Sequence, residues 1–262
     1  MFNFKKKYGQ NFLVDKNIVN KIVDSVDKEE SNLVIEIGCG DGRLTSSLVK
    51  EFDNVLCYEI DTELKDTLLD KFGSVKNVDF IFNDFLLCNV KEDVSKYDVE
   101  HIYVIANLPY YITTPIIEKI INSGIDIDKM CIMVQKEVAD RFSAKPGTKD
   151  YGSISVYLNY YFDIKRLFVV SRNSFIPKPN VDSAVVLFSK KDRFFVKDED
   201  VFFKLVRDSF KFKRKTIRNN LKDYDLEVIE KVLEKYSFDL NVRAEALSLE
   251  IFIDIANRLA NN

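Results

Sequence analysis

The chain has 262 residues, 46% of them hydrophobic and 31% charged, and its formal net charge is −3. This length permits a sizeable buried core, and the composition excludes an intrinsically disordered chain. The single histidine, His101, excludes Ser-His-Asp and Cys-His catalysis and histidine-rich metal sites, so we expect no metal.

The sequence carries no sign of secretion or of a membrane span. Its longest uncharged stretch, residues 101–117, is interrupted by an asparagine and two prolines, so it cannot form a membrane helix. The N-terminal segment has no apolar stretch of signal-peptide length. The four cysteines are widely separated, as structural thiols are in a reducing compartment. We expect a cytoplasmic protein with no membrane partner.

Short β-rich runs alternate with helix-patterned segments through most of the chain. We predict seven strands, at residues 33–37, 55–59, 78–82, 102–106, 131–135, 164–170 and 183–189. This alternation indicates an α/β fold with βαβ units and a parallel sheet. The last two runs leave little room for a helix between them, so the seven-stranded sheet should be mixed and end in an antiparallel pair.

The strand pattern stops after Lys190, and the rest of the chain is charged and helix-patterned, as in residues 226–238 and 247–260. The charged stretch 190–200 is the natural joint. We therefore predict a catalytic domain over residues 1–192 and a small all-helical domain over residues 193–262.

A glycine-rich loop, EIGCGDG at residues 36–42, follows the first predicted strand of the sheet. Glycines let the backbone turn tightly near a ligand, and free amides at the start of the next helix would face that ligand. The dinucleotide pattern needs a glycine where Arg43 stands, which disfavours NAD and FAD. The acidic-x-Gly-x-Gly-x-Gly spacing is instead the pattern of S-adenosylmethionine sites. Alone, the loop fits a tight turn equally well.

Two acids follow the next two predicted strands. Glu59 ends the second strand, where a carboxylate can accept both ribose hydroxyls of a nucleoside, and Asp84 follows the third, where it can accept from an adenine amino group. Either acid alone would be interpreted as a solvated carboxylate. Together, at successive carboxyl ends of strands, they favour a nucleoside pocket.

The stretch NLPY, residues 107–110, follows the fourth predicted strand. An exocyclic amine is a poor nucleophile because its lone pair is delocalised into the base. If the Asn107 side-chain oxygen and the Leu108 carbonyl both accept from it, charge that develops during methyl transfer is stabilised. Pro109 would fix that carbonyl, and Tyr110 would stack on the base. Thr114 should cap the next helix, with Pro115 at its first position. A plain strand-to-helix turn is the alternative.

These motifs resemble those of the ribosomal RNA adenine N6-dimethyltransferases over nearly the whole chain. The matching segments are YGQNFLVD (8–15), EIGCGDGRLT (36–45), YEID (58–61), NDFL (83–86), NLPYYITTPII (107–117), VQKEVADRF (134–142), KDYGSISV (149–156), FIPKPNVDSAVV (175–186), FKRKTIRNNL (212–221) and RAEALSLEIF (243–252).

The resemblance implies a Rossmann-like, S-adenosylmethionine-dependent methyltransferase fold and assigns roles to residues. Asn11 and Leu13 would belong to a segment that folds over the cofactor. The other cofactor positions would be Gly38, Gly40, Glu59, Ile60, Asp84, Phe85 and Asn107. Phe175 would close on the face of the base opposite Tyr110, although Phe175 would otherwise be read as a core residue.

The resemblance extends to one branch of the family. Members that methylate 23S rRNA and confer macrolide resistance tend to carry Ile in place of Leu108 and to lack the Thr-Pro of 114 and 115. This sequence has both features of the small-subunit branch. Membership of that branch implies dimethylation of two adjacent adenines near the 3′ end of 16S rRNA. It also implies a monomer that acts on the small subunit or its precursor. The 23S activity and a noncatalytic ribosome-assembly factor remain the alternatives.

An acidic chain needs a local basic surface to bind RNA. Residues 201–222 contain eight basic residues and one acid, a net charge of +7, so the remainder of the chain carries −10. Such a concentration supplies phosphate contacts in spite of the acidic total, although charged helices are usually only solvated. We expect RNA contacts from Lys211, Lys213, Arg214, Lys215 and Arg218. A methyltransferase of proteins or small molecules would have no need of them.

Overall fold

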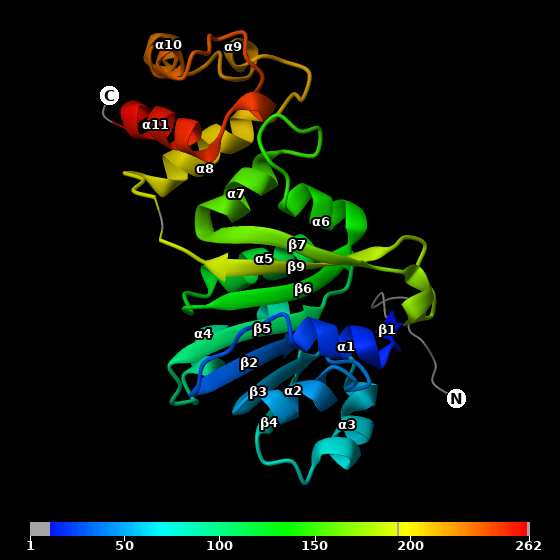
Figure 1. The fold of residues 1–262 in the computed structure, drawn as a ribbon. Helices are drawn as coiled ribbons and strands as arrows, with labels where there is room; N and C mark the ends of the chain where they lie inside the picture. Colours follow the sequence, from blue (N-terminus) through cyan, green and yellow to red (C-terminus); the bar gives the residue numbers. More distant parts are fainter. Residues whose placement is uncertain (1–10, 193, 261–262) are drawn as a thin grey trace. The chain divides into compact units, whose positions relative to one another are not determined.

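The structure is a computed structural model that describes residues 11–192 and 194–260 (Figure 1). Its main feature is a seven-stranded sheet with the order β4-β3-β2-β5-β6-β9-β7. The strands are β2 (Asn32–Ile37), β3 (Asn54–Glu59), β4 (Val78–Phe82), β5 (His101–Asn107), β6 (Lys129–Gln135), β7 (Phe162–Val170) and β9 (Ser183–Lys190). All seven predicted strands are confirmed.

The sheet is mixed, as predicted. Strands β4, β3, β2, β5 and β6 pair in parallel, whereas β9 runs antiparallel to β6, with Lys129 opposite Ser189 and Gln135 opposite Ser183. The order reverses at β2, because β3 lies on one side of it and β5 on the other. A reversal of this kind leaves a crevice at the carboxyl ends of the strands, where open α/β sheets bind ligands.

Helices and short helical turns connect the strands. The helices are α1 (Lys16–Val23), α2 (Thr45–Glu51), α3 (Lys65–Phe72), α4 (Val90–Val94), α5 (Thr113–Asn122), α6 (Lys136–Phe142), α7 (Ser153–Tyr161), α8 (Glu199–Ser209), α9 (Ile217–Asn220), α10 (Leu226–Lys235) and α11 (Leu249–Leu259). Within the described ranges, no helix has the length and apolar content needed to cross a bilayer.

Alternate residues of the central strands enter different parts of the core. Val34, Cys57 and Ile105 pack with α1, α2 and α3 in one apolar cluster. Their neighbours Leu33 and Leu56 are equally buried. Both faces of the sheet are therefore covered, which explains why these strands are continuous apolar runs in the sequence.

A second sheet of two short strands was not predicted. Strand β1 (Phe12–Leu13) runs antiparallel to β8 (Phe175–Ile176), with Leu13 opposite Phe175, and the Val14 amide donates to the Ser174 carbonyl at 2.9 Å. Two-residue strands give too little periodicity to detect in a sequence. This pairing holds residues 12–14 against residues 174–176.

The chain separates into two compact units. Of the described residues, the first contains 11–139 and 165–189, and the second contains 140–164, 190–192 and 194–260. The division near residue 190 lies close to the predicted joint, whereas residues 140–164, assigned to the catalytic domain from the sequence, group with the C-terminal helices. The reason is apolar packing: Tyr151, Val156 and Tyr160 share a core with residues such as Phe202 and Phe252.

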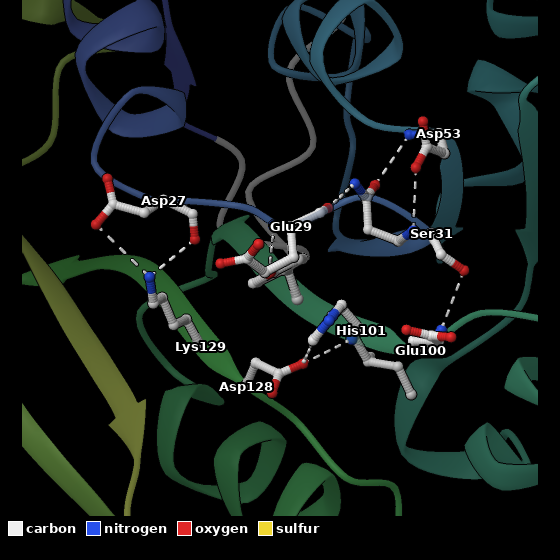
Figure 2. A network of polar contacts seen from close by, with 11 residues as sticks. Asp27, Glu29, Ser31, Asp53, Glu100, His101, Asp128 and Lys129 are labelled. Carbon is white, nitrogen blue, oxygen red and sulfur yellow. Dashed lines mark hydrogen bonds and ion pairs between the residues drawn. The ribbon is translucent and has the colours of Figure 1, made fainter.

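Polar residues close the amino end of the sheet, a region we define as residues 27–32, 53, 100–103, 128 and 129 (Figure 2). Asn32, which is buried, and Asp53, which is exposed, exchange two hydrogen bonds, since each side chain accepts from the other's backbone amide, at 2.9 and 3.1 Å. The Asn32 amide group also donates to the Glu29 carbonyl at 2.6 Å. Asp128 accepts from the Ile102 amide and contacts His101 Nδ1, both at 3.1 Å. All of these hydrogen bonds join residues within this region.

Candidate active site

A pocket opens at the carboxyl end of the sheet, formed by the residues after β2, β3 and β5 and by the segment that contains β1. Its lining residues are Asn11, Phe12, Leu13, Val19, Ile22, Glu36, Gly38, Cys39, Gly40, Asp41, Arg43, Leu44, Glu59, Ile60, Asn107, Leu108, Pro109 and Tyr110. Ten of the predicted site residues therefore line one pocket, although they come from four separate parts of the sequence.

The glycine loop owes its shape to left-handed backbone conformations, with φ of 74° at Gly38 and 57° at Gly40. A Cβ atom on Gly40 would lie 2.7 Å from the Phe12 ring, so only glycine lets the β1 segment approach the loop. Helix α2 begins at Thr45, later than the loop suggests, and the Gly40 amide is not free because it donates to Glu59 Oε2 at 2.8 Å. The predicted role of free helix amides therefore does not extend to Gly40.

Glu59 is held rigidly at the end of β3. Its Oε2 accepts from the Gly40 amide and its Oε1 from the Asp61 amide, each at 2.8 Å, and the residue is only 4% exposed. Burial raises the pKa of its carboxyl, while these two amides act in the opposite direction. Each carboxylate oxygen can accept more than one hydrogen bond, so Glu59 retains acceptor capacity toward the pocket.

Glu36, the residue at which the glycine-rich loop motif begins, is a buried carboxylate with no role predicted from the sequence. Glu36 is fully buried on β2, accepts from the Thr45 hydroxyl at 2.6 Å and lies 3.5 Å from the Cys57 sulfur. Burial raises the pKa of Glu36 to about 7, against the effect of the Thr45 hydrogen bond. Its place as the acidic residue of the loop motif was the only signal in the sequence. The four cysteines are buried and free.

Asn107 and Leu108 present two acceptor oxygens at the end of β5. The Asn107 side-chain amide donates through Nδ2 to the Asn11 carbonyl at 3.1 Å, which fixes the orientation of Oδ1. The Leu108 amide donates to the Met133 carbonyl at 3.2 Å. Within the described part of the chain, neither Asn107 Oδ1 nor the Leu108 carbonyl receives a hydrogen bond. Both oxygens are therefore available to a ligand.

The Pro109 carbonyl, in contrast, is used by the turn that follows Leu108. Pro109 O accepts from the Ile112 amide at 3.3 Å and from the Thr113 hydroxyl at 3.2 Å. Helix α5 begins at Thr113, with Ile112 at the N-cap position and no side-chain cap, so the prediction that Thr114 caps this helix is wrong. Pro115 is still in the first turn, where a missing amide proton costs no helical hydrogen bond.

Tyr110 lines the pocket, and a hydrogen bond to Ser183 holds its hydroxyl. Its hydroxyl lies 2.6 Å from the hydroxyl of Ser183, the fully buried first residue of β9. Burial raises the pKa of the Tyr110 phenol, so the hydroxyl stays protonated at neutral pH. The hydrogen bond fixes one end of the ring, and Ser183 was not recognised from the sequence because its partner lies 73 positions away.

Three of the predicted catalytic and cofactor-binding residues lie outside this lining. Asp84 caps a short helical turn by accepting from the Leu86 amide at 2.9 Å. Phe85 is buried against Tyr58, with ring centroids 5.0 Å apart. Phe175 is 2% exposed in the core of the first unit, so stacking on a base would require its ring to leave that core. The motif residues 8–10 lie outside the described residues.

The predicted RNA-binding residues belong to the second unit. Lys211, Lys213, Arg214 and Lys215 are exposed in the segment between α8 and α9, and Arg218 is exposed on α9. Arg218 approaches Glu230 at 3.8 Å, an exposed pair that contributes little to stability. These five basic residues, which are close in the sequence, therefore lie together in the α8–α9 segment and on α9.

The chain is similar to ribosomal RNA methyltransferases over almost its full length. A family model described as ribosomal RNA adenine dimethylase matches residues 1–261. Two relatives are named ribosomal RNA small subunit methyltransferase A. The one from Anoxybacillus flavithermus is 43% identical and is matched over 98% of this chain and 91% of its own. The one from Geobacillus sp. is 44% identical, over 98% and 92%.

Solved structures are similar in fold. A dimethyladenosine transferase from Plasmodium falciparum superimposes with a TM-score of 0.78 at 25% identity, over 93% of this chain and 95% of its own. The 23S rRNA methyltransferase ErmE gives a TM-score of 0.76 at 23% identity, over 95% and 100%, which supports the fold alone. The seven-stranded mixed sheet followed by helices is thus a methyltransferase fold.

Proposed function

Because the chain belongs to the ribosomal RNA adenine dimethylase family, we propose that it transfers methyl groups from S-adenosylmethionine to the N6 amines of adenines in small-subunit ribosomal RNA. The observation that carries this proposal is the pair of free acceptor oxygens, Asn107 Oδ1 and Leu108 O, in the pocket that also holds Glu59 and the glycine loop. An amine and a nucleoside cofactor can meet there.

The lining of the pocket fits S-adenosylmethionine. The glycine loop lets the ligand approach the backbone closely, and Glu59, fixed by two backbone amides, offers acceptors to the ribose hydroxyls. Asn11, Leu13 and Ile60 also line the pocket. Asp84 and Phe85, which follow β4 and lie outside the lining, are proposed to serve the adenine end. When bound, the cofactor supplies an electrophilic methyl group on a sulfonium.

Asn107 and Leu108 act on the target amine. In the first transfer each accepts one N–H bond from it, and in the second transfer the monomethylated amine has one N–H left to donate to one of them. These hydrogen bonds localise the lone pair and stabilise the positive charge that develops on nitrogen as the N–C bond forms. The Asn11 carbonyl holds Asn107 Nδ2, so the Oδ1 atom cannot exchange places with the amide nitrogen. The amine becomes strongly acidic once methylated, so solvent can take its proton and no histidine base is required.

Tyr110 and Phe175 are proposed to flank the extruded base. Tyr110 is suited to this role because the Ser183 hydrogen bond fixes its ring at the pocket. Stacking on an aromatic ring contributes about 1–3 kcal/mol per base. For Phe175 to contact the opposite face of the base, its ring would have to move out of the core. The pairing of β1 with β8 would have to permit that movement.

We propose the small-subunit substrate, two adjacent adenines near the 3′ end of 16S rRNA, on the names of the relatives above and on the motifs NLPY and TTP. The RNA-binding residues Lys211, Lys213, Arg214, Lys215 and Arg218 would contact its phosphates. We further propose that the protein acts as a monomer in the cytoplasm, on the subunit or its precursor.

The test is mass-spectrometric detection of dimethyladenosine after the purified protein is incubated with labelled S-adenosylmethionine and undermethylated small subunits, with large subunits in parallel. The proposal expects dimethyladenosine in the small subunits only. Methylation of the large subunits alone would instead support the 23S activity. RNA binding without any methylation would support a noncatalytic assembly factor.

A further inference from the structure

The basic segment between α8 and α9 holds an exposed aromatic ring. Phe212 is 56% exposed and stands between Lys211 and Lys213, with Arg214 and Lys215 following, all of them exposed. Phe210, two positions earlier, faces the core instead, with its ring centroid 5.8 Å from that of Phe252. The segment therefore packs one of its two phenylalanines, partly buried, against the core and leaves the other in solvent.

The backbone around Phe212 is fixed at several points. The Asn220 side chain accepts from the Phe212 amide at 3.2 Å and donates to the Phe212 carbonyl at 3.3 Å and to the Ser209 carbonyl at 2.7 Å. The Lys215 amide also donates to the Phe212 carbonyl, at 2.9 Å. Lys213 Nζ reaches the Lys149 carbonyl at 3.0 Å. These bonds hold the Phe212 backbone in place while its ring remains outside the core.

We propose that Phe212 is a stacking platform for an unpaired base of the RNA substrate. An exposed ring among lysines and arginines combines the two features of single-strand recognition, a π-face for a base and cations for the phosphates on either side. Lys211 Nζ, 5.7 Å from the ring centroid, places one cation next to that face. The surrounding positive charge favours RNA over an apolar protein partner.

This inference rests on the proposed function and adds a second base contact, outside the methylation pocket. It concerns affinity for single-stranded RNA and not the chemistry at Asn107. Stacking does not depend on charge, so the ring should contribute to affinity without changing its salt dependence. Each phosphate contact, in contrast, adds about 0.7 to the slope of log affinity against log salt for a single strand.

The experiment measures binding of the full-length protein to a labelled single-stranded RNA oligonucleotide and to the duplex of the same strand, by fluorescence anisotropy over a salt series. The variants are Phe212→Ala, Phe212→Leu, which keeps an apolar side chain without a ring, and Phe212→Tyr, which keeps the ring. Phe195→Ala, at a 75% exposed ring outside the basic segment, is the matched control.

Phe212→Ala and Phe212→Leu should weaken single-strand binding by roughly 5- to 150-fold, the range that corresponds to one stacked base. Phe212→Tyr and Phe195→Ala should bind as the wild type does. Duplex binding and the salt slope should not change, because duplex bases already stack on one another. Lys215→Ala should do the opposite and lower the slope by about 0.7.

The proposal is overturned if Phe212→Leu binds the single strand as tightly as the wild type. It is also overturned if Phe212→Ala weakens duplex and single strand equally, or if the variant keeps full RNA affinity but loses binding to a ribosomal protein. Methylation of undermethylated small subunits by the wild type separates the two proposals. Active wild type with an unaffected Phe212→Leu variant contradicts only the stacking inference, whereas wild type that binds RNA and never methylates it contradicts only the proposed function.

Discussion

The two ends of the large sheet use similar polar residues in opposite ways. At the amino end, Asn32 places both arms of its amide on backbone partners, so both polar groups of this side chain are used in internal hydrogen bonds. At the carboxyl end, Asn107 uses only its Nδ2 atom internally and leaves Oδ1 to the pocket. An asparagine that bonds through both arms stabilises the fold, and one that keeps an oxygen free can act on a ligand.

The sharpest way to break this comparison is the same substitution at the carboxyl end. Asn107→Ala removes one of the two acceptors for the amine and should lower the methylation rate by about 10²- to 10³-fold, as loss of one preorganised hydrogen-bonding group does elsewhere. The midpoint of urea unfolding should change little, because only one internal hydrogen bond is lost. Single-turnover methylation and urea titration measure the two effects. Full activity of the variant would remove Asn107 from the mechanism.

Glu36 lies between the two cases, since its Oε2 atom accepts internal hydrogen bonds and the residue also lines the pocket. Its pKa of about 7 in the folded protein lies above the ordinary value of 4.5. The folded state therefore binds the proton more tightly than the unfolded state, so this group favours folding fully below pH 4.5, and that contribution is lost as the pH rises to 7. The loss is on the order of 3 kcal/mol.

Glu36→Gln removes this titration and can still accept from the Thr45 hydroxyl. The free energy of unfolding of the variant should consequently fall less than that of the wild type between pH 5 and pH 8, by up to about 3 kcal/mol. Urea unfolding of the ligand-free proteins at the two pH values gives the comparison. Parallel pH profiles for the two proteins would show that the Glu36 proton does not contribute to stability.

At the amino end, Asn32→Ala should have the reverse outcome of Asn107→Ala. The change leaves the Asp53 amide and the Glu29 carbonyl without their buried partner and should cost about 1–3 kcal/mol of stability. The methylation rate per folded molecule should remain that of the wild type, since no residue of the amino end lines the pocket. A stable variant with impaired methylation would invalidate the division between the two ends.

The sequence predicted the sheet better than it predicted the site. The apolar runs of β2 to β6 are long and bounded by turn residues, so the existence of these strands could be read directly. The acceptors Glu59 and Asn107 could also be placed, because parallel strands bring their carboxyl ends together. What could not be read were contacts between distant segments with no local pattern, such as Asn11 with Asn107 and β1 with β8.

Contacts between distant segments also explain why the bounds of the helical unit could not be predicted from the sequence. Residues 140–164 follow β6 without a change in composition, and only the packing of Tyr151 and Tyr160 with the C-terminal helices assigns them to the second unit. Likewise, Phe175 and Phe85 have the sequence context of site residues, but both rings are buried away from the lining of the pocket. Burial depends on what the rest of the chain packs against each ring.

The smallest effect that we expect concerns the hydrogen bond between Ser183 and Tyr110 at the carboxyl end of the sheet. Ser183→Ala removes the 2.6 Å hydrogen bond to the Tyr110 hydroxyl, so the Tyr110 ring is retained but is no longer fixed at that end. The KM for the RNA should therefore rise by about fivefold, the equivalent of one hydrogen bond, with kcat little changed. Tyr110→Phe removes the same bond from the other side. If the two residues act only through that bond, the double variant should be no worse than either single variant. Additive effects in steady-state kinetics would mean that Ser183 and Tyr110 contribute separately, and that the ring is positioned by its packing against the pocket wall.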